Sequence, residues 1–425
     1  MADASKPLKV AVIGTGIAGL TVANGLKDQA ELLVFERNDH IGGHTHTHSV
    51  THEGVCYAID TGFIVFNDWT YPAFIALLDT LGVDSKPSTM SFSVRCDRTG
   101  LEYNGTNFNA LFAQRRNLFS PRFIGMILDI LRFNKSAPTL LDEGQKDWLL
   151  GDYLRHERYG QAFIDHYILP MGAAVWSTST HDMLQFPARF FVQFFLNHGM
   201  LSVDRRPTWR VISGGSKSYV EALVRPFQDS IRTNTAVAGV RRFEDHVVVR
   251  TAEGQSFQVD QVVLACHSDE ALSLLEDPSD DERQTLGALK YQANEAVLHT
   301  DTRLLPLRRL AWASWNYQIP KTASDRVTVT YNMNLLQGIE APVTFCVSLN
   351  PASPIDPSKV IRQMTYHHPL FTLDSMAAQR RHSQISGLQR TYYAGAYWGY
   401  GFHEDGVKSG LEVLNQLQRN YLSQR

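Results

Sequence analysis

The sequence predicts an α/β protein whose first unit is a strand, a glycine turn, a helix and a second strand. Residues 9–13 form a short apolar run, and residues 14–20 (GTGIAGL) form a glycine-rich turn that leads into a helical pattern as far as Lys27. A second apolar run over residues 31–35 ends in Glu36. Because these features occur in register, they predict a Rossmann-like unit that binds a dinucleotide.

The residues of the glycine turn have distinct predicted tasks. Gly14 permits the tight turn, Gly16 lets the backbone approach a pyrophosphate, and Gly19 lets the helix pack closely on the strand. The phosphate charge is then expected at the N-terminus of the helix, beside Ile17 and Ala18.

The residues after the second strand indicate which dinucleotide binds. Glu36, followed by Arg37, lies at the distance where a carboxylate accepts hydrogen bonds from ribose hydroxyls. Gly42 and Gly43 then form a second glycine pair. A nicotinamide enzyme does not require this pair, whereas an extended FAD must pass a second segment of main chain, which glycines allow. We therefore predict FAD as the cofactor.

Five histidines surround this glycine pair between residues 40 and 52. His44, His46 and His48 alternate, so on a strand they would face one side, where they could ligate zinc or copper. They directly follow a cofactor loop, however, and no acid or cysteine stands among them. We therefore expect a polar strand face and no metal.

Length and composition set outer bounds on the function. A chain of 425 residues exceeds the usual size of one hydrophobic core and predicts two domains. The net charge of -3 gives no general attraction to nucleic acid, so no such partner is expected. No secretory signal and no apolar stretch of membrane-spanning length are visible. Four widely spaced cysteines fit a reducing cytoplasm.

The two glycine segments resemble those of the FAD-dependent superfamily that includes flavin amine oxidases, protoporphyrinogen oxidase and phytoene desaturase. Three later pieces share the resemblance, at residues 60–62, 231–266 and 392–414. The resemblance implies further cofactor contacts in these pieces, namely Thr61, Gly62, Val237, Ala265, Gly395, Glu404, Gly406 and Val407. His44 stands where amine oxidases usually have an arginine, and we include it among the contacts. No cysteine lies in the last piece, which implies a non-covalent FAD.

A narrower resemblance extends over about residues 8–420. Residues 60–72, 109–117, 159–177 and 310–318 are similar to the flavoprotein region that precedes the methyltransferase domain in plant cyclopropane fatty acid synthases, and to its stand-alone bacterial counterparts. This resemblance implies a lipid acyl substrate and a lipid methyltransferase as a partner. The lysine that amine oxidases hold near the flavin has no clear counterpart, since Lys290 is a candidate by position alone.

The resemblance also implies how the domains are arranged. A discontinuous FAD-binding domain would comprise residues 1–70, 205–270 and 385–425, interleaved with an α+β substrate-binding domain. The patterns agree, because residues 121–135 and 183–197 have helical spacing, whereas residues 242–265 and 326–349 alternate like strands.

Few catalytic groups are expected, because the flavin carries out the difficult step. His403 is our first candidate, since the ordinary pKa of histidine suits proton transfer near neutrality; it could equally serve only to bond a backbone carbonyl. Trp315 and Asn316 lie in a strand-like segment and are expected to line a pocket, although tryptophan is equally common in a core. Phe63, with Tyr71, receives the same interpretation.

We predict an FAD-dependent oxidoreductase that takes a hydride from a C–H bond of an apolar substrate, a lipid acyl chain, in a desaturation, oxidation or isomerisation. The sequence has a single G-x-G-x-x-G turn, so the electrons are expected to come from the substrate and not from NAD(P)H. Two alternatives stay open: a flavin amine oxidase, and a non-catalytic flavoprotein partner of a lipid methyltransferase.

Two stretches bear on contact with lipids. Residues 113–135 combine five basic side chains with an apolar helical stripe, which is typical of a helix on an anionic membrane surface. This predicts peripheral contact with the inner face of the membrane. Residues 189–201 contain four phenylalanines that could line an acyl tunnel. A solvated helix and a core helix are the alternatives.

Overall fold

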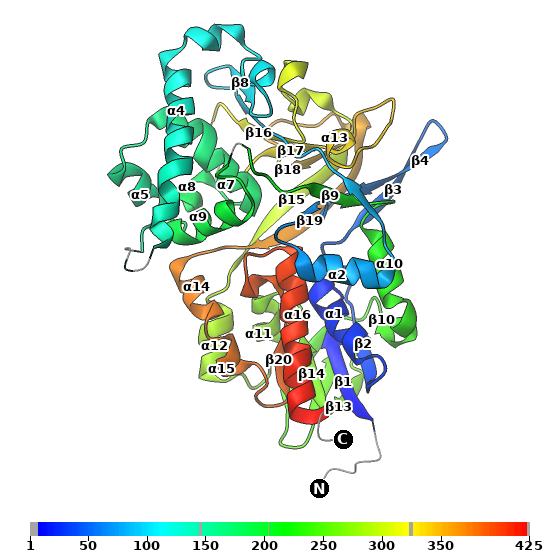
Figure 1. Cartoon of the computed structure of the whole chain (residues 1–425). Coiled ribbons are helices and arrows are strands. Elements are labelled where there is room, and N and C mark those ends of the chain that lie inside the picture. Colours follow the sequence, from blue (N-terminus) through cyan, green and yellow to red (C-terminus); the bar gives the residue numbers. More distant parts are fainter. Residues whose placement is uncertain (1–6, 143, 145–146, 203, 323–325, 423–425) are drawn as a thin grey trace.

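A five-stranded parallel sheet forms one half of the molecule, the lower half in Figure 1. In spatial order its strands are β10 (Ile231–Arg232), β2 (Ala30–Phe35), β1 (Leu8–Ile13), β14 (Gln261–Leu264) and β20 (Thr391–Tyr393). The strands come from three distant parts of the chain. Their Val-, Ile- and Leu-rich composition suits a parallel sheet, because both faces of such a sheet are covered.

Different elements cover the two faces of this sheet. On one face, α1 (Ile17–Leu26) packs against α16 (His403–Leu417), flanked by α2 (Pro72–Leu81) and α10 (Lys217–Val224). The other face meets an antiparallel sheet of β11 (Val237–Arg242), β12 (Val247–Thr251) and β13 (Ser256–Val259), with α11 (Ser268–Leu274) and α12 (Asp280–Gly287) beside it. The smaller helices α14 (Leu373–Gln379) and α15 (His382–Ile385) complete this half.

A seven-stranded mixed sheet forms the other half. In spatial order its strands are β19 (Val360–Pro369), β15 (Tyr291–His299), β18 (Cys346–Leu349), β17 (Val329–Asn332), β16 (Trp315–Ile319), β7 (Phe92–Cys96) and β8 (Leu101–Asn104). A helical layer buries the aromatic core against it: α3 (Phe108–Leu111), α4 (Pro121–Ser136), α5 (Leu150–His156), α6 (Gln161–Phe163), α7 (Leu169–Trp176), α8 (Thr180–Leu184) and α9 (Ala188–Asn197). The short α13 (Met333–Leu336) joins β17 to the loop before β18.

Two small sheets connect the halves. One is the hairpin of β3 (Thr47–His52) and β4 (Val55–Asp60), and the other is β5 (Phe66–Asn67), β9 (Trp209–Ile212) and β6 (Ser85–Pro87). The computed structural model describes residues 7–142, 144, 147–202, 204–322 and 326–422. No helix within these ranges is long and apolar enough to span a bilayer.

Most of the predicted periodic segments have the expected structure. Residues 121–135 form α4, and residues 242–265 contain strands. Two segments differ from the prediction. The helix expected at residues 183–197 is split into α8 and α9, because Pro187 has no N–H to continue the first helix. Residues 326–349 contain two strands, as predicted, but α13 lies between them.

The expected histidine strand face is partly wrong. His48 lies in β3, but His44 and His46 precede the strand, in the segment after the second glycine pair. The rings of His46 and His48 still lie close, with centroids 4.1 Å apart. Within the described ranges, no group of three or more His, Cys, Asp or Glu side chains is arranged to hold a metal ion.

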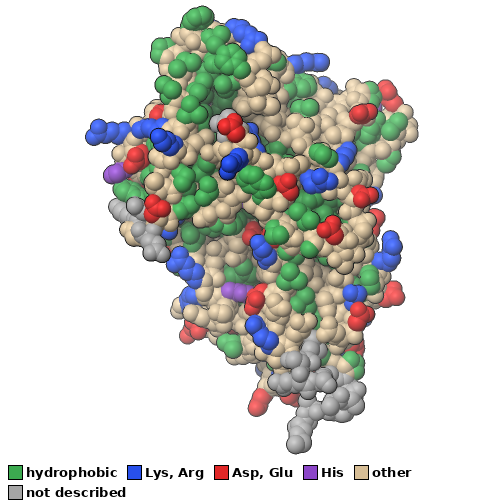
Figure 2. Space-filling view, in the orientation of Figure 1, with side chains coloured by type: hydrophobic (Ala, Val, Ile, Leu, Met, Phe, Trp, Pro, Cys, Tyr) green, Lys and Arg blue, Asp and Glu red, His purple; other side chains and the backbone are tan. Residues whose placement is uncertain are grey.

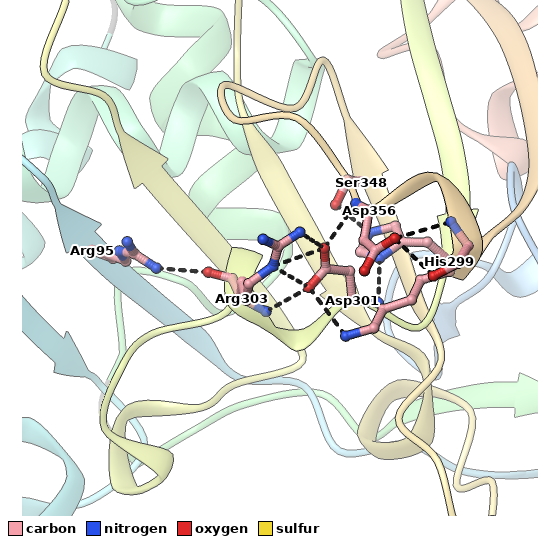
Figure 3. A network of polar contacts seen from close by, with 8 residues as sticks. Arg95, His299, Asp301, Arg303, Ser348 and Asp356 are labelled. Carbon is pink, nitrogen blue, oxygen red and sulfur yellow. Dashed lines mark hydrogen bonds and ion pairs between the residues drawn. The ribbon is translucent and has the colours of Figure 1, made fainter.

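Satisfied polar networks fix the outer parts of both halves. In the parallel-sheet half, Arg242 and Tyr393 both donate to Glu282 at 2.5 Å. In the seven-stranded half, Asp301 accepts hydrogen bonds from Arg303 at 2.5 Å and from the backbone of Asp356 at 3.0 Å (Figure 3). These bonds, above all that from Arg303, lower the pKa of Asp301. Since neither carboxylate faces the cavity described below, we interpret both networks as structural.

Candidate functional site

A cavity of about 610 Å³ lies between the two halves. One part, here called the nucleotide end, is lined by residues 13–18, 36–38, 42–44, 235–237 and 265–267. The other part, here called the substrate end, is lined by residues 63–65, 175–177 and 366–369, with side chains from β16, β17 and β18. The cavity therefore joins the glycine segments to the large mixed sheet.

The two glycine segments form the floor of the nucleotide end. Gly16 and Gly42 form an isolated parallel bridge, which holds the two loops side by side. Gly14 has a φ of +105°, and a Cβ there would lie 2.6 Å from the carbonyl oxygen of Ala265. At Gly16, in contrast, a Cβ would have no described atom within 4 Å. The backbone at Gly16 is therefore open to the cavity, as close approach of a pyrophosphate requires.

The predicted ribose acid lies at the end of β2, where it lines the nucleotide end. The buried Glu36 carboxylate accepts hydrogen bonds from the Thr15 backbone N–H at 3.1 Å and from that of Asn38 at 2.9 Å. These bonds fix the carboxylate at the cavity wall. Arg37, next along the chain, pairs with Glu270 at 2.5 Å.

All of the predicted cofactor residues line this cavity except Gly19, Glu404, Gly406 and Val407. Gly19 lies where the prediction put it, against the strand, since a Cβ there would be 2.1 Å from the carbonyl oxygen of Gly14. Gly406 serves a similar purpose between helices, because its Cβ would lie 2.6 Å from Ile17. Gly406 and Val407 belong to the packing of α16 and not to the cavity wall.

Glu404 has a different task from the one predicted. Its carboxylate accepts hydrogen bonds from the backbone N–H groups of Ala73 at 3.1 Å and Phe74 at 2.9 Å, at the start of α2. These donors are among the first N–H groups of a helix, which have no partner within the helix. Glu404 therefore caps α2, and the predicted cofactor contact is not what the structure places there.

His403 lines the cavity, but its ring is not protonated near neutral pH. Its Nε2 lies 2.6 Å from the hydroxyl of Tyr219 and 3.2 Å from that of Thr45, and its ring stacks on Phe63 at 3.6 Å. Burial lowers the pKa of His403 to about 3. The ring is therefore neutral at physiological pH, and the expectation of a pKa near neutrality is wrong.

Trp315 and Asn316 separate on opposite faces of β16, as neighbours on a strand do. Trp315 lines the substrate end, and its ring meets that of Tyr331 edge-on at 4.9 Å. Asn316 does not line the cavity. Its amide donates to the carbonyl groups of Ala313 and Thr330 and accepts from Ser93, so its hydrogen-bonding capacity is used in the core. The placement of Asn316 thus corrects its predicted pocket role.

The predicted Phe63 and Tyr71 both line the cavity. Tyr397, for which the sequence made no prediction, lines it as well. The phenylalanines of residues 190–195 are buried in α9 and form a layer behind the wall. Phe190 packs against Phe371 of the cavity at 5.1 Å. The run is therefore core and not the lining of a tunnel.

Sequence reasoning missed a cluster of aromatic and histidine rings around His44. The rings of Tyr366 and His368, both from β19, lie 5.3 and 5.6 Å from that of His44, and His267 lies at 6.2 Å. Burial and the neighbouring His368 and His267 lower the pKa of His44 well below its ordinary value. Burial likewise lowers the pKa of His368 to about 4. The segment YHHP at residues 366–369 was the available signal, since β19 brings it to the cavity.

Tyr366 connects this cluster to the predicted cofactor segment at residues 60–62. Its hydroxyl lies 2.7 Å from the hydroxyl of Thr61 and 3.2 Å from Nδ1 of His46. It thereby ties β19 of the mixed sheet to the loop that follows the second glycine pair.

The residues present fit the expected FAD. The open backbone at Gly16 and the N-terminus of α1 would receive the pyrophosphate, and Glu36 would receive the ribose. Val237 would meet the adenine from a third segment of main chain. The buried Nε2 of His44 has no partner among the described residues and is free to bond a cofactor atom.

Comparison with known proteins agrees with this assignment. A family model for flavin containing amine oxidoreductases matches residues 17–334. No protein of curated function matches the sequence. Among solved structures, a CLA-producing fatty acid isomerase from P. acnes is similar at a TM-score of 0.68 and 16% identity, covering 99% of this chain and 100% of that one.

Two further solved structures share the fold. Cyclohexylamine oxidase from Brevibacterium oxydans IH-35A has a TM-score of 0.68 at 14% identity, covering 97% of this chain and 100% of that one. A putative protoporphyrinogen oxidase from Exiguobacterium sp. 255-15 has a TM-score of 0.70 at 16% identity, covering 98% and 99%. The chain is therefore a member of the flavin-containing amine oxidoreductase family and an FAD-dependent oxidoreductase.

Proposed function

We propose that this enzyme oxidises or isomerises a lipid acyl chain by removing a hydride from one of its C–H bonds. The observation that carries the proposal is the uncharged substrate end. Among the described residues that line the cavity, the charged side chains are Glu36 and Arg37 of the nucleotide end and Glu270, which pairs with Arg37. The substrate end is chiefly aromatic and aliphatic, and burial lowers the pKa of its His368 to about 4, so that this ring is neutral; this end therefore favours an apolar substrate.

FAD, when bound, would accept the hydride; an isomerisation would return it to another carbon of the same acyl chain, and a desaturation would also release a proton from the neighbouring carbon. The side chains at the substrate end exclude water and orient the acyl chain. Phe63 and Phe371 provide apolar surface, and Trp315 with Tyr331 forms a fixed aromatic corner. His403 is held neutral against Phe63 and is suited to hydrogen bonding at this wall.

Amine oxidation is the competing function, and one observation weighs against it. Lys290, the single positional candidate for the family's lysine, is exposed, and no lysine occurs among the described residues that line the cavity. One structural neighbour is a fatty acid isomerase, which supports the acyl proposal because the same fold serves an acyl substrate in that protein.

The test is anaerobic reduction of the bound flavin. The purified yellow protein is mixed separately with unsaturated or methylated phospholipids, with free fatty acids and with a set of amines, and flavin bleaching is followed. We expect bleaching, or conversion of the acyl double-bond pattern without net bleaching, with an acyl lipid. Bleaching by amines alone would overturn the acyl substrate. No change with any compound would favour the role of partner to a lipid methyltransferase.

A further inference from the structure

An exposed apolar face lies far from the nucleotide end, on the outer side of the seven-stranded half. It is formed by α3, η1 (Arg115–Phe119) and the first half of α4. Phe119 is 87% exposed and Phe108 is 69% exposed, and Leu118 and Leu128 are also exposed. Figure 2 shows hydrophobic side chains gathered at the top of the molecule, over the region of α4 and β8. We call the surface formed by Phe108, Leu118, Phe119 and Leu128 the apical face.

A basic pocket of about 140 Å³ lies beside the apical face. Arg116 and Arg122 line it, and within the described ranges neither guanidinium has a carboxylate or hydrogen-bond partner. The neighbouring Arg115, in contrast, donates to the carbonyl oxygen of Phe112 at 2.9 Å. Two arginines therefore reach the pocket without a protein partner.

A buried histidine provides a second, independent indication of a ligand. His166 is only 4% exposed, lines the same pocket, and has an Nδ1 with no partner among the described residues. Burial lowers the pKa of His166, and Arg122 lowers it further. A neutral imidazole with a free nitrogen, next to two unpaired guanidinium groups, suits the oxygens of a phosphate group.

The free charge around the apical face is positive. Residues 97–129 contain four arginines and three acidic residues, Asp97, Glu102 and Asp129. Asp97 pairs with Arg95, Glu102 with Arg308 and Asp129 with Arg132, so none of the three is paired with an arginine of this segment. A surface that combines positive charge with exposed phenylalanine is suited to an anionic lipid interface, because the rings enter the acyl boundary while the cations meet the phosphates.

We propose that the apical face docks on an anionic phospholipid bilayer, with a lipid phosphate bound in the pocket of Arg116, Arg122 and His166. This pocket is connected to the active site by one continuous helical segment, residues 161–176, because Trp176 at its end lines the main cavity. Ten residues of helix separate His166 from Trp176, or roughly 15 Å. Docking therefore holds the substrate end close to the lipid. Only the statement that docking brings the substrate end close to its lipid substrate rests on the proposed function.

The test is co-sedimentation of the flavin-loaded protein with vesicles. We expect binding to vesicles of phosphatidylcholine mixed with phosphatidylglycerol, and little binding to phosphatidylcholine alone. The double variant Arg116→Ala/Arg122→Ala should bind about thirtyfold more weakly, about fivefold for each charge removed. Phe119→Ser should bind about tenfold more weakly, because an inserted ring is lost. Both changes affect exposed side chains, so the fold is expected to be unaffected.

Matched control variants lie on the other half of the molecule. Leu388→Ser removes a side chain that is 56% exposed, and Arg283→Ala removes an exposed arginine of α12. Both should bind vesicles as the unmodified protein does. Equal binding by all variants, or no preference for anionic vesicles, would overturn the proposal. Binding of inorganic phosphate without vesicle binding would make the pocket a small-anion site and would equally overturn docking.

A parallel measurement separates this inference from the proposed function. Flavin reduction by a soluble, short-chain acyl compound should be unchanged in Phe119→Ser and in the double arginine variant, since none of these residues lines the main cavity. Failure of the acyl proposal would abolish this reduction in every variant and leave vesicle binding intact.

Discussion

The two ends of the central cavity are built in different ways. The nucleotide end is made chiefly of main chain, from short glycine segments in which each residue has a fixed place relative to the others. The substrate end is made of side chains that arrive from α7, from four strands of the mixed sheet and from the loop at residues 63–65. A site of the first kind can be recognised from spacing, whereas a site of the second kind exists only after the chain has folded.

The largest expected effect comes from closing the nucleotide end. Gly16→Val should abolish flavin binding while the protein still folds, because the new side chain projects into the open space of the cavity and meets no described atom. Visible absorbance per chain measures the bound flavin. Gly105→Val is the matched control, since a Cβ at Gly105 also has open space but lies far along the chain on an exposed turn. A yellow Gly16→Val protein would place the FAD elsewhere.

The substrate end should make stability depend on pH. Burial lowers the pKa of His403 to about 3 and that of His368 to about 4. In the unfolded chain both histidines have the ordinary pKa of about 6.5, so below that pH the unfolded chain binds more protons than the folded protein. Stability is full above that pH and falls as the pH drops. Asp60 and Asp405, with pKa values that burial raises to about 6, oppose this in part. The two histidines account for a loss of about 4 kcal/mol between pH 7 and 5 and the two aspartates for a gain of about 3 kcal/mol, so these four groups leave a net loss of about 1 kcal/mol.

Urea unfolding of the flavin-loaded protein at several pH values measures this loss. His403→Asn should flatten the pH dependence, because one buried imidazole no longer has to be protonated on unfolding. The same pH dependence in His403→Asn and in the unmodified protein would contradict the assignment of a neutral imidazole at position 403.

A smaller effect is expected where the two ends meet. Tyr366→Phe removes the hydroxyl that contacts Thr61 and His46, but leaves the ring in the cavity wall. Flavin reduction by the substrate should become about tenfold slower, the equivalent of one hydrogen bond, while flavin content stays constant. Tyr392→Phe is the control, because this buried hydroxyl bonds Asn420 away from the cavity. Loss of flavin from the Tyr366 variant would assign the residue to the nucleotide end instead.

The smallest effect tests whether Glu404 only caps α2 or also contacts the cofactor at the nucleotide end. Glu404 caps α2, and a neutral amide accepts hydrogen bonds less strongly than a carboxylate. Glu404→Gln should therefore lower the free energy of unfolding by about 1 kcal/mol. Flavin content and the reduction rate should not change. Urea unfolding and visible absorbance of the same samples check both expectations, and weaker flavin binding at unchanged stability would restore Glu404 as a cofactor contact.

The same contrast explains how much could be predicted. Gly14, Gly16 and Gly19 were assigned from spacing alone, because backbone sterics fix what each glycine permits. Glu404 was misassigned, since the helix terminus that it caps begins about 330 residues earlier in the sequence. Asn316 was misassigned because a strand places neighbouring residues on opposite faces, and the sequence did not show which face meets the cavity.

The position of β20 in the parallel sheet has a consequence for biosynthesis. This edge strand, with the cavity residue Gly395 directly after it, pairs with β14 but is synthesised well over a hundred residues after it. At roughly 5–20 residues per second, the open edge of β14 waits on the order of ten seconds for β20. The flavin pocket is thus completed only after β20 has been synthesised, and the open edge of β14 must be kept from pairing with other strands until then.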